Sequence, residues 1–370
     1  MKLSAKPAKS DSKFEEYFRE VQQVFLYVTN ECGLRCKQCL YKPWLRKEEF
    51  DLEVAEALLI KFKKLGASKL SLLGGEPTRY QHLAKLVGFS KDRGYEYVRM
   101  DTNGQFEKNL LLDIDLRKID EISFSLDGHN SEINDEIRGN GSFGKCVANI
   151  KKAVDLGYNV NITCCIHRGN VGRDEEGRLL IERMIEFAAS LGVSRINFHP
   201  LFRMGVPRDD WAGDTDILPK EWLKIYRAVR SNIEDGKYGI QVRIPQRFVT
   251  QEEFDKNPGY YGYCPVKMGE RVLIHPNGQI QICALMIGTP YRVANFGVDS
   301  EKKIRIRWDN INDEIVKGNF DLNNPTPCTN QKKEIGDLVP LCISFKPSQD
   351  EFIWEKLHQK WVLKFRGVRR

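Results

Sequence analysis

The chain has 370 residues, of which 41% are hydrophobic and 29% are charged, and its net charge is +7. These values are typical of folded globular proteins and leave room for a large domain followed by a smaller one. No stretch approaches the roughly 20 successive apolar residues that span a bilayer, so we expect no membrane partner. Residues 1–12 lack the apolar core of a signal peptide, and we therefore expect a cytoplasmic protein with reduced thiols.

Hydrophobic periodicity predicts six successive strand–helix pairs. The predicted strands cover residues 24–28, 69–73, 97–101, 121–126, 160–166 and 195–198, and the helices that follow them cover 52–65, 83–91, 107–112, 144–156, 180–191 and 221–233. This alternation predicts an α/β fold with parallel strands and helices outside. Periodicity leaves undecided whether the strands form an open sheet or a barrel, but in both cases the loops after the strands form the site.

Three cysteines follow the first predicted strand. Cys32, Cys36 and Cys39 have the spacing C-x3-C-x2-C, which supplies one thiolate fewer than a closed 4Fe–4S cluster uses. Structural zinc is the first alternative, but it favours a fourth ligand nearby, and the next cysteine is Cys146. A disulfide framework is the second, but ten cysteines are few for a secreted chain of this length.

The loops after the next strands are also unusual in composition. Gly74-Gly75-Glu76-Pro77 follows the second strand, Thr102-Asn103-Gly104 the third, and Ser125-Leu126-Asp127-Gly128 the fourth. Each of these segments taken alone could be a tight turn. Because all of them follow strands at the same rim, we expect them to form one site with the cysteines.

In order and spacing, these motifs resemble those of radical S-adenosylmethionine (radical SAM) enzymes, together with Arg138 and Gly141-Ser142-Phe143. The resemblance covers roughly residues 24–200. It implies a partial (β/α)6 TIM-like barrel and a 4Fe–4S cluster on the three cysteines. It also implies that the amino and carboxylate groups of S-adenosylmethionine (SAM) bind the iron that has no cysteine.

The resemblance also implies roles for individual side chains in binding SAM. Gly74 and Gly75 would bring backbone carbonyls close to the cofactor's ammonium group, because no Cβ blocks access. Glu76 would add a charge-assisted contact to the same ammonium. Arg138 would pair with the cofactor's carboxylate through its planar fork of donors, and Ser125 would be a hydrogen-bonding neighbour.

The reaction implied is the reductive cleavage of SAM to a 5′-deoxyadenosyl radical, which abstracts a hydrogen atom from the substrate. Oxidation, epimerisation or cross-linking at a C–H bond would follow. The expected partners are a peptide or small polar substrate and an electron donor such as flavodoxin or ferredoxin. Gln38 departs from the family pattern, which usually has an aromatic residue or histidine there, and this leaves the adenine contact unassigned.

The last third of the chain carries a second cysteine pattern. Cys264 and Cys283 have the spacing C-x13-G-x4-C around an Asn-Gly hairpin turn, and Cys328 and Cys342 follow. This resembles the SPASM and twitch extensions of the same superfamily and implies one auxiliary 4Fe–4S cluster. Cys342 lies in an apolar run and could instead be a core residue, which would leave this cluster with an open iron.

We expect four segments. A tail covers residues 1–20, the barrel 21–235, a connecting region with a SPASM/twitch-like domain 236–345, and a terminal helix with a basic tail 346–370. The remaining cysteines are expected to be small buried hydrophobes, namely Cys146, Cys164 and Cys165. Three further side chains could face a pocket, or could be ordinary surface or core-edge residues, namely His199, Arg203 and Arg243.

Parts of the sequence also suggest two other functions. The basic ends suggest an iron–sulfur RNA-modifying or RNA-binding protein, but residues 366–370 contain no aromatic platform, and we do not expect a nucleic-acid partner. An iron–sulfur electron carrier or sensor is the other alternative, but such a protein would need neither Gly74–Pro77 nor Arg138.

Overall fold

A computed structural model describes residues 21–107, 109–201, 219–234, 237–261, 269–284, 292–299, 303–308 and 338–341. It also describes the isolated positions Glu15, Phe18, Arg19, Ile217 and Ile287. None of the helices within these residues is long and apolar enough to cross a membrane.

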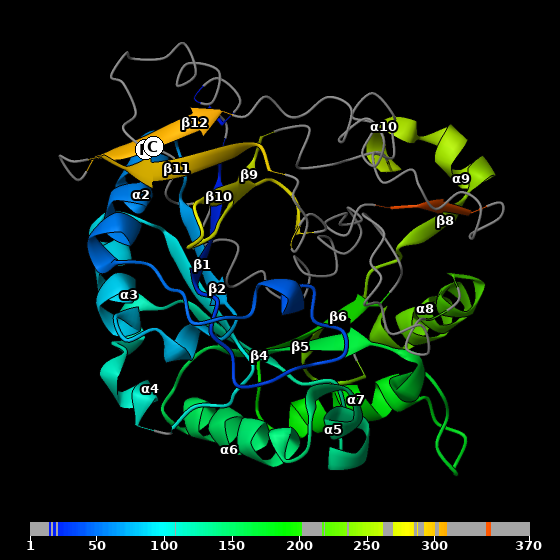
Figure 1. The fold of residues 1–370 in the computed structure, drawn as a ribbon. Helices are drawn as coiled ribbons and strands as arrows, with labels where there is room; N and C mark the ends of the chain where they lie inside the picture. The colour runs from blue at the N-terminus through cyan, green and yellow to red at the C-terminus, as the bar shows by residue number, and fades with distance from the viewer. Residues whose placement is uncertain are drawn as a thin grey trace, which may run out of the picture.

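A curved sheet of parallel strands is the centre of the fold (Figure 1). Seven strands follow one another in sheet order as they do in sequence, and each pairs in parallel with the next. They are β1 (Gln23–Thr29), β2 (Lys69–Gly74), β3 (Tyr97–Thr102), β4 (Glu121–Ser125), β5 (Val160–Ile166), β6 (Arg195–Pro200) and β7 (Gln241–Arg243). The first six confirm the predicted strands, and β7 adds one that is only three residues long.

Helices cover the outer face of this sheet (Figure 1). They are α2 (Leu52–Lys64), α3 (Leu83–Asp92), α4 (Leu110–Asp113), α5 (Ser131–Arg138), α6 (Ser142–Asp155), α7 (Leu180–Ser190) and α8 (Pro219–Glu234). α2 forms because its apolar residues recur at helical spacing, and Ala55, Leu58, Leu59 and Phe62 are all buried. The helix α5 was not predicted. The α/β class with a mostly parallel sheet is confirmed.

The two faces of the sheet differ in polarity. On β3 the buried residues Val98, Met100 and Thr102 alternate with the partly exposed Tyr97, Arg99 and Asp101. Because successive side chains of a strand point to opposite faces, the apolar set packs against the helices and the polar set lines the inside of the curve. The inside is where a substrate would meet the loops at the rim.

Further strands extend the sheet beyond β1. Strand β9 (Arg271–Ile274) pairs with β1 in parallel, and β10 (Gln279–Gln281), β11 (Ala294–Val298) and β12 (Ile304–Trp308) follow as antiparallel neighbours. The predicted Asn-Gly hairpin is confirmed between β9 and β10, with Gly278 at φ +85°. The hairpin therefore continues the barrel sheet, and Figure 1 shows it beside β1.

The remaining described strands form a second, smaller sheet, whose Phe248 and Leu338 pack into the main core. Strands β8 (Phe248–Thr250) and β13 (Leu338–Pro340) pair as a two-stranded antiparallel sheet, next to the short helices α9 (Gln251–Lys256) and α10 (Pro258–Tyr261). Val249, Phe254, Val339 and Leu341 make its apolar cluster. The predicted terminal helix at residues 350–365 lies outside the described residues.

Candidate active site

The cysteine loop leaves β1 and is fixed at both of its ends. The backbone N–H of Asn30 donates to the carbonyl of Glu48 at 2.7 Å, and that of Phe50 donates to Val28 at 3.0 Å, which closes the loop against β1. The C-terminus of α5 supports the middle of the loop, where Lys37 N–H donates to Ile137 at 2.9 Å. Carbonyls at a helix C-terminus have no partner within the helix, and the loop supplies one.

Cys32, Cys36 and Cys39 are all free and partly buried. They are close enough to interact electrostatically, since Cys39 raises the pKa of both Cys32 and Cys36, and Cys32 also raises that of Cys36. Burial is the larger cause, and it raises the pKa of Cys36 to about 12 and that of Cys32 above its ordinary value. A bound cation would offset both effects, because metal binding requires the thiolate form.

Two N–H groups point at the sulfur of Cys32. The backbone N–H of Leu34 and the side-chain Nδ2 of Asn103 each lie 3.4 Å from Sγ. Asn103 comes from the loop after β3, so a second rim loop reaches the cysteines directly. Donors of this kind favour a thiolate.

This donor set fits a 4Fe–4S cluster better than a single metal ion. Among the described residues, no three His, Cys, Asp or Glu side chains are placed to hold one ion. Each cysteine of a 4Fe–4S cluster binds a different iron, so its three sulfurs need not converge on one point. A loop with three adjacent thiols, one already accepting N–H donors, meets that requirement.

Gly74 and Gly75 lie where the end of β2 meets the start of the cysteine loop. A Cβ on Gly74 would lie 2.4 Å from the carbonyl oxygen of Thr29, and one on Gly75 would lie 2.5 Å from that of Glu31. The backbone N–H groups of Gly75 and Glu76 donate to these same two carbonyls. Glycine is therefore required for backbone packing of the two loops, and the predicted contact of Gly74 and Gly75 with the cofactor stays a prediction.

Glu76 is buried and connects two rim loops. Its Oε1 accepts from the hydroxyls of Thr78 and Thr102, both at 2.7 Å, and its Oε2 accepts from the N–H of Asn103 at 2.7 Å. Burial raises the pKa of Glu76, while these hydrogen bonds oppose the rise. The structure thus gives Glu76 a positioning role that sequence did not predict, and its predicted contact with an ammonium stays a prediction.

Arg138 is paired with Asp127 rather than standing free. Its Nε lies 2.6 Å from Asp127 Oδ2, and both side chains are largely buried. Burial alone would lower the pKa of Arg138, but the charge of Asp127 beside it raises it. Gln38 Nε2 donates to the same Oδ2 at 2.7 Å. The pairing of Arg138 with the cofactor's carboxylate remains a prediction, now with Asp127 as its support.

Asp127 therefore organises this side of the site. Besides Arg138 and Gln38, it accepts the backbone N–H of Cys165 at 2.6 Å through Oδ1. Its own N–H donates to Asn134 Oδ1 at 3.0 Å. Ser125, two residues earlier, is half-buried at the end of β4, and its predicted contact with the cofactor is not tested.

Of the predicted auxiliary ligands, Cys264, Cys328 and Cys342 lie outside the described residues. Cys283 follows β10 and is partly buried. Burial raises the pKa of Tyr27 on β1. The charges of Asp101, Cys283 and Cys39 raise it further, so Cys283 and Cys39 both lie near this tyrosine. The second predicted cysteine site therefore begins close to the first.

The isolated cysteines behave largely as expected. Cys146 and Cys164 are buried, each 1% exposed, which confirms their prediction as small hydrophobes. Cys165 is only partly buried and lies on the inner face of β5 near Asp127. That prediction is wrong for Cys165, because Cys165 falls on the opposite pleat from Cys164.

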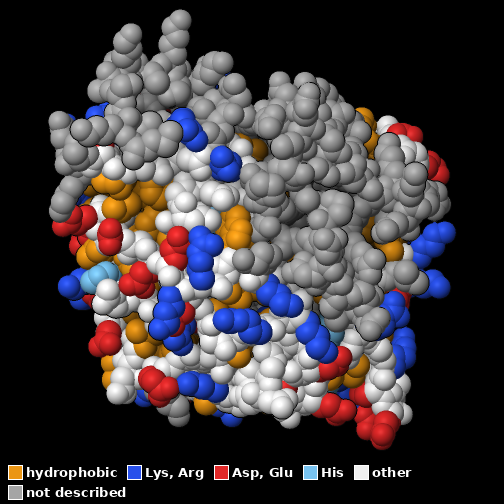
Figure 2. All heavy atoms as spheres, viewed as in Figure 1, with side chains coloured by type: hydrophobic (Ala, Val, Ile, Leu, Met, Phe, Trp, Pro, Cys, Tyr) orange, Lys and Arg blue, Asp and Glu red, His pale blue; other side chains and the backbone are white. Residues whose placement is uncertain are grey.

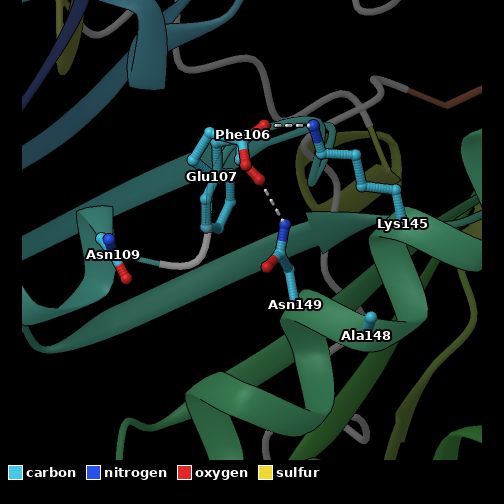
Figure 3. A pocket seen from close by; sticks show the side chains of 6 residues that line it. All are labelled: Phe106, Glu107, Asn109, Lys145, Ala148 and Asn149. Atoms are coloured by element: carbon cyan, nitrogen blue, oxygen red, sulfur yellow. Dashed lines mark hydrogen bonds and ion pairs between the residues drawn. The ribbon is translucent and has the colours of Figure 1, made fainter.

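A shallow pocket outside this rim is drawn in Figure 3. It has a volume of about 230 Å³ and lies between α6 and the loop after β3. Lys145 pairs with Glu107 at 2.9 Å, and the Nδ2 of Asn149 donates to the carbonyl of Phe106 at 2.9 Å, whereas the Oδ1 of Asn149 makes no hydrogen bond within the described residues. It is not part of the candidate site.

Comparison with known proteins decides the family. Residues 26–181 match the model of the Radical SAM superfamily. These residues form a radical SAM domain. Radical SAM enzymes use a 4Fe–4S cluster and SAM, so these are the cofactors of this enzyme too, and solved neighbours include complexes with S-adenosylmethionine.

The curated relatives of this radical SAM enzyme include probable GTP 3′,8-cyclases. The protein of Saccharolobus islandicus strain M.14.25 is 28% identical over 273 residues, which cover 73% of this chain and 84% of the relative. The protein of Saccharolobus solfataricus strain P2 is 29% identical over the same shares.

Solved structures share the fold of the radical SAM enzyme. SuiB of Streptococcus suis, bound to its precursor peptide SuiA, has a TM-score of 0.58 at 18% identity, covering 76% of this chain and 64% of SuiB. Native anSMEcpe with bound AdoMet has a TM-score of 0.60 at 15% identity, covering 94% of this chain and 100% of that chain. These likenesses show the fold alone.

Sequence reasoning missed two residues of this radical SAM site. The sequence predicts only that Asn103 lies in a rim loop, yet its side chain reaches Cys32, and it shows Asp127 only as part of a motif, yet this carboxylate pairs with Arg138. One signal was available for Asp127. It lies two residues after Ser125, on the same side of the strand end, and a carboxylate buried there needs a cationic partner. Arg138 was the nearest predicted one.

Proposed function

We propose that the three cysteines hold the SAM-binding 4Fe–4S cluster, and that the enzyme cleaves SAM reductively to remove a hydrogen atom from a substrate C–H bond. When bound, the cluster and SAM supply the radical. The contact of Asn103 with Cys32 carries the proposal, because it joins the cysteines to a second rim loop. Glu76 holds Asn103 in place through its backbone N–H.

The protein's own residues would orient the cofactor. The Asp127–Arg138 pair places a guanidinium beside the cysteine loop, where it suits a carboxylate. The hydroxyl of Ser125 and the backbone of Gly74 and Gly75 border the same rim. The barrel interior would hold the substrate away from bulk water.

The test is the release of 5′-deoxyadenosine from SAM by the anaerobically reconstituted, reduced protein, measured by mass spectrometry. Cys32→Ala should abolish it, and Cys146→Ala, which changes a buried cysteine outside the loop, should retain it. If the wild-type protein with intact iron releases no 5′-deoxyadenosine, the proposed function is rejected.

The finer substrate assignment also belongs to the proposal. The sequence relatives named as GTP 3′,8-cyclases favour a small polar metabolite such as a nucleotide. A peptide is the second candidate, favoured by the peptide-bound structures of SuiB and anSMEcpe. Stimulation of 5′-deoxyadenosine release by GTP, but not by peptide mixtures, would favour the nucleotide over the peptide as substrate.

The auxiliary site and the domain limits are proposed with it. Cys264, Cys283, Cys328 and Cys342 would hold one further 4Fe–4S cluster in the region 236–345, after a barrel of residues 21–235. Iron content near eight per chain would support two clusters, whereas iron near four per chain would contradict the auxiliary one. The RNA-binding alternative would require binding of a generic RNA with steep salt dependence.

A further inference from the structure

The inner face of the sheet carries a row of charged side chains below the rim. Arg99 on β3 pairs with Asp101 and lies 3.3 Å from Glu121 on β4. Arg195 on β6 lies 2.6 Å from the other oxygen of Glu121. The two carboxylates, Asp101 and Glu121, are therefore already paired with the two arginines, Arg99 and Arg195.

Arg243 adds a third cation to this row. It ends β7 and lies opposite Asn197 of β6 in register. Because Asn197 and Arg195 are two residues apart on β6, Arg243 shares the inner face with Arg195, and the charged or titratable groups that act on it are Arg195, Glu121, Tyr97 and Arg99. Within the described part of the chain, Arg243 makes neither an ion pair nor a hydrogen bond. Burial and the charge of Arg195 lower its pKa to about 10.

The neighbouring strands also present polar atoms without partners. Asn161 on β5 is 1% exposed, yet neither its Oδ1 nor its Nδ2 makes a hydrogen bond. Its register partner is Arg195, whose buried Nε has no hydrogen bond either. Buried polar groups are nearly always paired. The unused donors of Asn161 on β5, Arg195 on β6 and Arg243 on β7 therefore indicate a binding site for a ligand that carries acceptor atoms.

Side chains on the same face of the sheet are more exposed nearer the rim. Thr163 and Cys165 on the same face of β5 are partly exposed, and His199 on β6 is exposed although it faces inward. His199 lies opposite Cys165 in register and four residues after Arg195 along β6, which places it nearer the carboxyl ends of the strands than the arginine row. A molecule reaching from the cofactor into the barrel would meet the arginines.

We propose that Asn161, Arg195 and Arg243 form an oxyanion subsite, which binds a phosphate or carboxylate group of a small-molecule substrate inside the barrel. The proposal rests on the proposed function, since it names the class of substrate for that site. Guanidinium groups bind such oxyanions through paired N–H donors, and the amide of Asn161 adds another donor. The surplus positive charge of the row is then neutralised by the substrate.

The test is calorimetric titration of the reconstituted full chain, with SAM present, using pyrophosphate and citrate as probes. The two anions distinguish phosphate from carboxylate binding, and either one bound supports the subsite. Arg243→Gln and Asn161→Asp should each weaken binding at least tenfold, and Arg243→Lys should weaken it less. Arg227→Gln, on an exposed position of α8, is the control and should bind as the wild type does.

Two results would overturn the subsite. The first is no binding of either anion by the folded wild-type protein, and the second is unchanged binding in both Arg243→Gln and Asn161→Asp. Release of 5′-deoxyadenosine by the wild type is measured separately. Release without Arg243-dependent binding rejects the subsite alone, whereas Arg243-dependent binding without release rejects the proposed function alone.

Discussion

Single side chains at the rim act mainly by holding loops together. Asp127 shows this best, because one buried carboxylate serves Arg138, Gln38 and the backbone of Cys165. A buried carboxylate with such partners is costly to remove, since each partner then loses its acceptor. The cation Arg138 would be the most affected.

Asp127→Ala is therefore expected to lower the free energy of unfolding by about 3–5 kcal/mol, the cost of leaving a buried charge without its partner. Urea unfolding of the reconstituted protein measures it. Asp115→Ala, at a surface pair with Arg117, is the matched control and should change stability little. Equal effects of the two substitutions would contradict the role given to Asp127.

Gly104 is a second residue whose identity follows from local geometry. It has φ +74°, and a Cβ there would lie 2.7 Å from the sulfur of Cys146. Gly104→Ala should lower the free energy of unfolding by about 1–3 kcal/mol, because the backbone at a positive φ becomes strained and the new methyl group has no room in the core. Thermal unfolding measures it.

The control for Gly104 is Gly88→Ala in α3, where nothing lies within 4 Å of the new Cβ. Since alanine favours a helix more than glycine does, the free energy of unfolding of this variant should rise by about 0.5–1 kcal/mol. A Gly104→Ala protein as stable as the wild type would show that the contact with Cys146 is not rigid.

At the scale of elements, the sequence predicted six strands and most helices, but not α5. That helix has only eight residues, with Asn134 and Ile137 as its buried positions, so it offers little apolar periodicity. Its signals were local, namely Asn130 as the N-cap and Gly139 after the last residue. Missing α5 concealed how Arg138 is positioned, because its C-terminus supports the cysteine loop.

The direct contacts of the site were less predictable than its loops. The spacing of motifs at strand ends brought Cys32, Glu76, Asn103 and Arg138 to one rim. Which of them touch depends on side-chain directions and on register, neither of which periodicity contains. The same holds for Arg243, whose strand β7 is too short to show alternation.

The β9–β10 hairpin is joined to the cysteine loop through an aromatic cluster. His275 follows β9, is fully buried, and lies 3.1 Å through Nδ1 from the hydroxyl of Tyr41. Its ring centroid lies 4.4 Å from that of Tyr27 on β1. Burial lowers the pKa of His275 to about 3, so the ring is neutral in the folded protein.

This predicts loss of stability in acid. The unfolded chain takes up a proton at His275 near its ordinary pKa of 6.5, while the folded chain resists it down to about 3. The stability that neutral His275 contributes is therefore complete above pH 6.5 and is lost progressively as the pH falls from 6.5 toward about 3. His275→Phe should reduce the pH dependence of the unfolding free energy between pH 6.5 and 5. An unchanged slope would show that His275 does not titrate on unfolding.

At the scale of the molecule, the cysteine loop is a basic surface. Five exposed cations lie on or beside it, namely Arg35, Lys37, Lys42, Arg46 and Lys47. Figure 2 shows Lys and Arg side chains gathered in the middle of one face. Such a surface suits an acidic electron donor, and we propose flavodoxin or ferredoxin as that donor.

Reduction of the protein by flavodoxin should therefore slow as ionic strength rises, because electrostatic steering is screened by salt. Lys42→Glu with Lys47→Glu should slow it several-fold, and stopped-flow absorbance measures both effects. Lys220→Glu with Lys224→Glu on α8 is the control pair. A rate independent of salt and of the loop lysines would exclude this surface as the docking site.

The claim that Cys32, Cys36 and Cys39 hold a cluster with an open iron for SAM is tested most directly by paramagnetic resonance. The reduced, anaerobically reconstituted protein is measured before and after SAM is added, with a Cys264→Ala/Cys283→Ala variant isolating the signal of the first cluster. We expect a 4Fe–4S signal that SAM shifts. A signal that SAM leaves unchanged, or that survives replacement of all three loop cysteines, would contradict it.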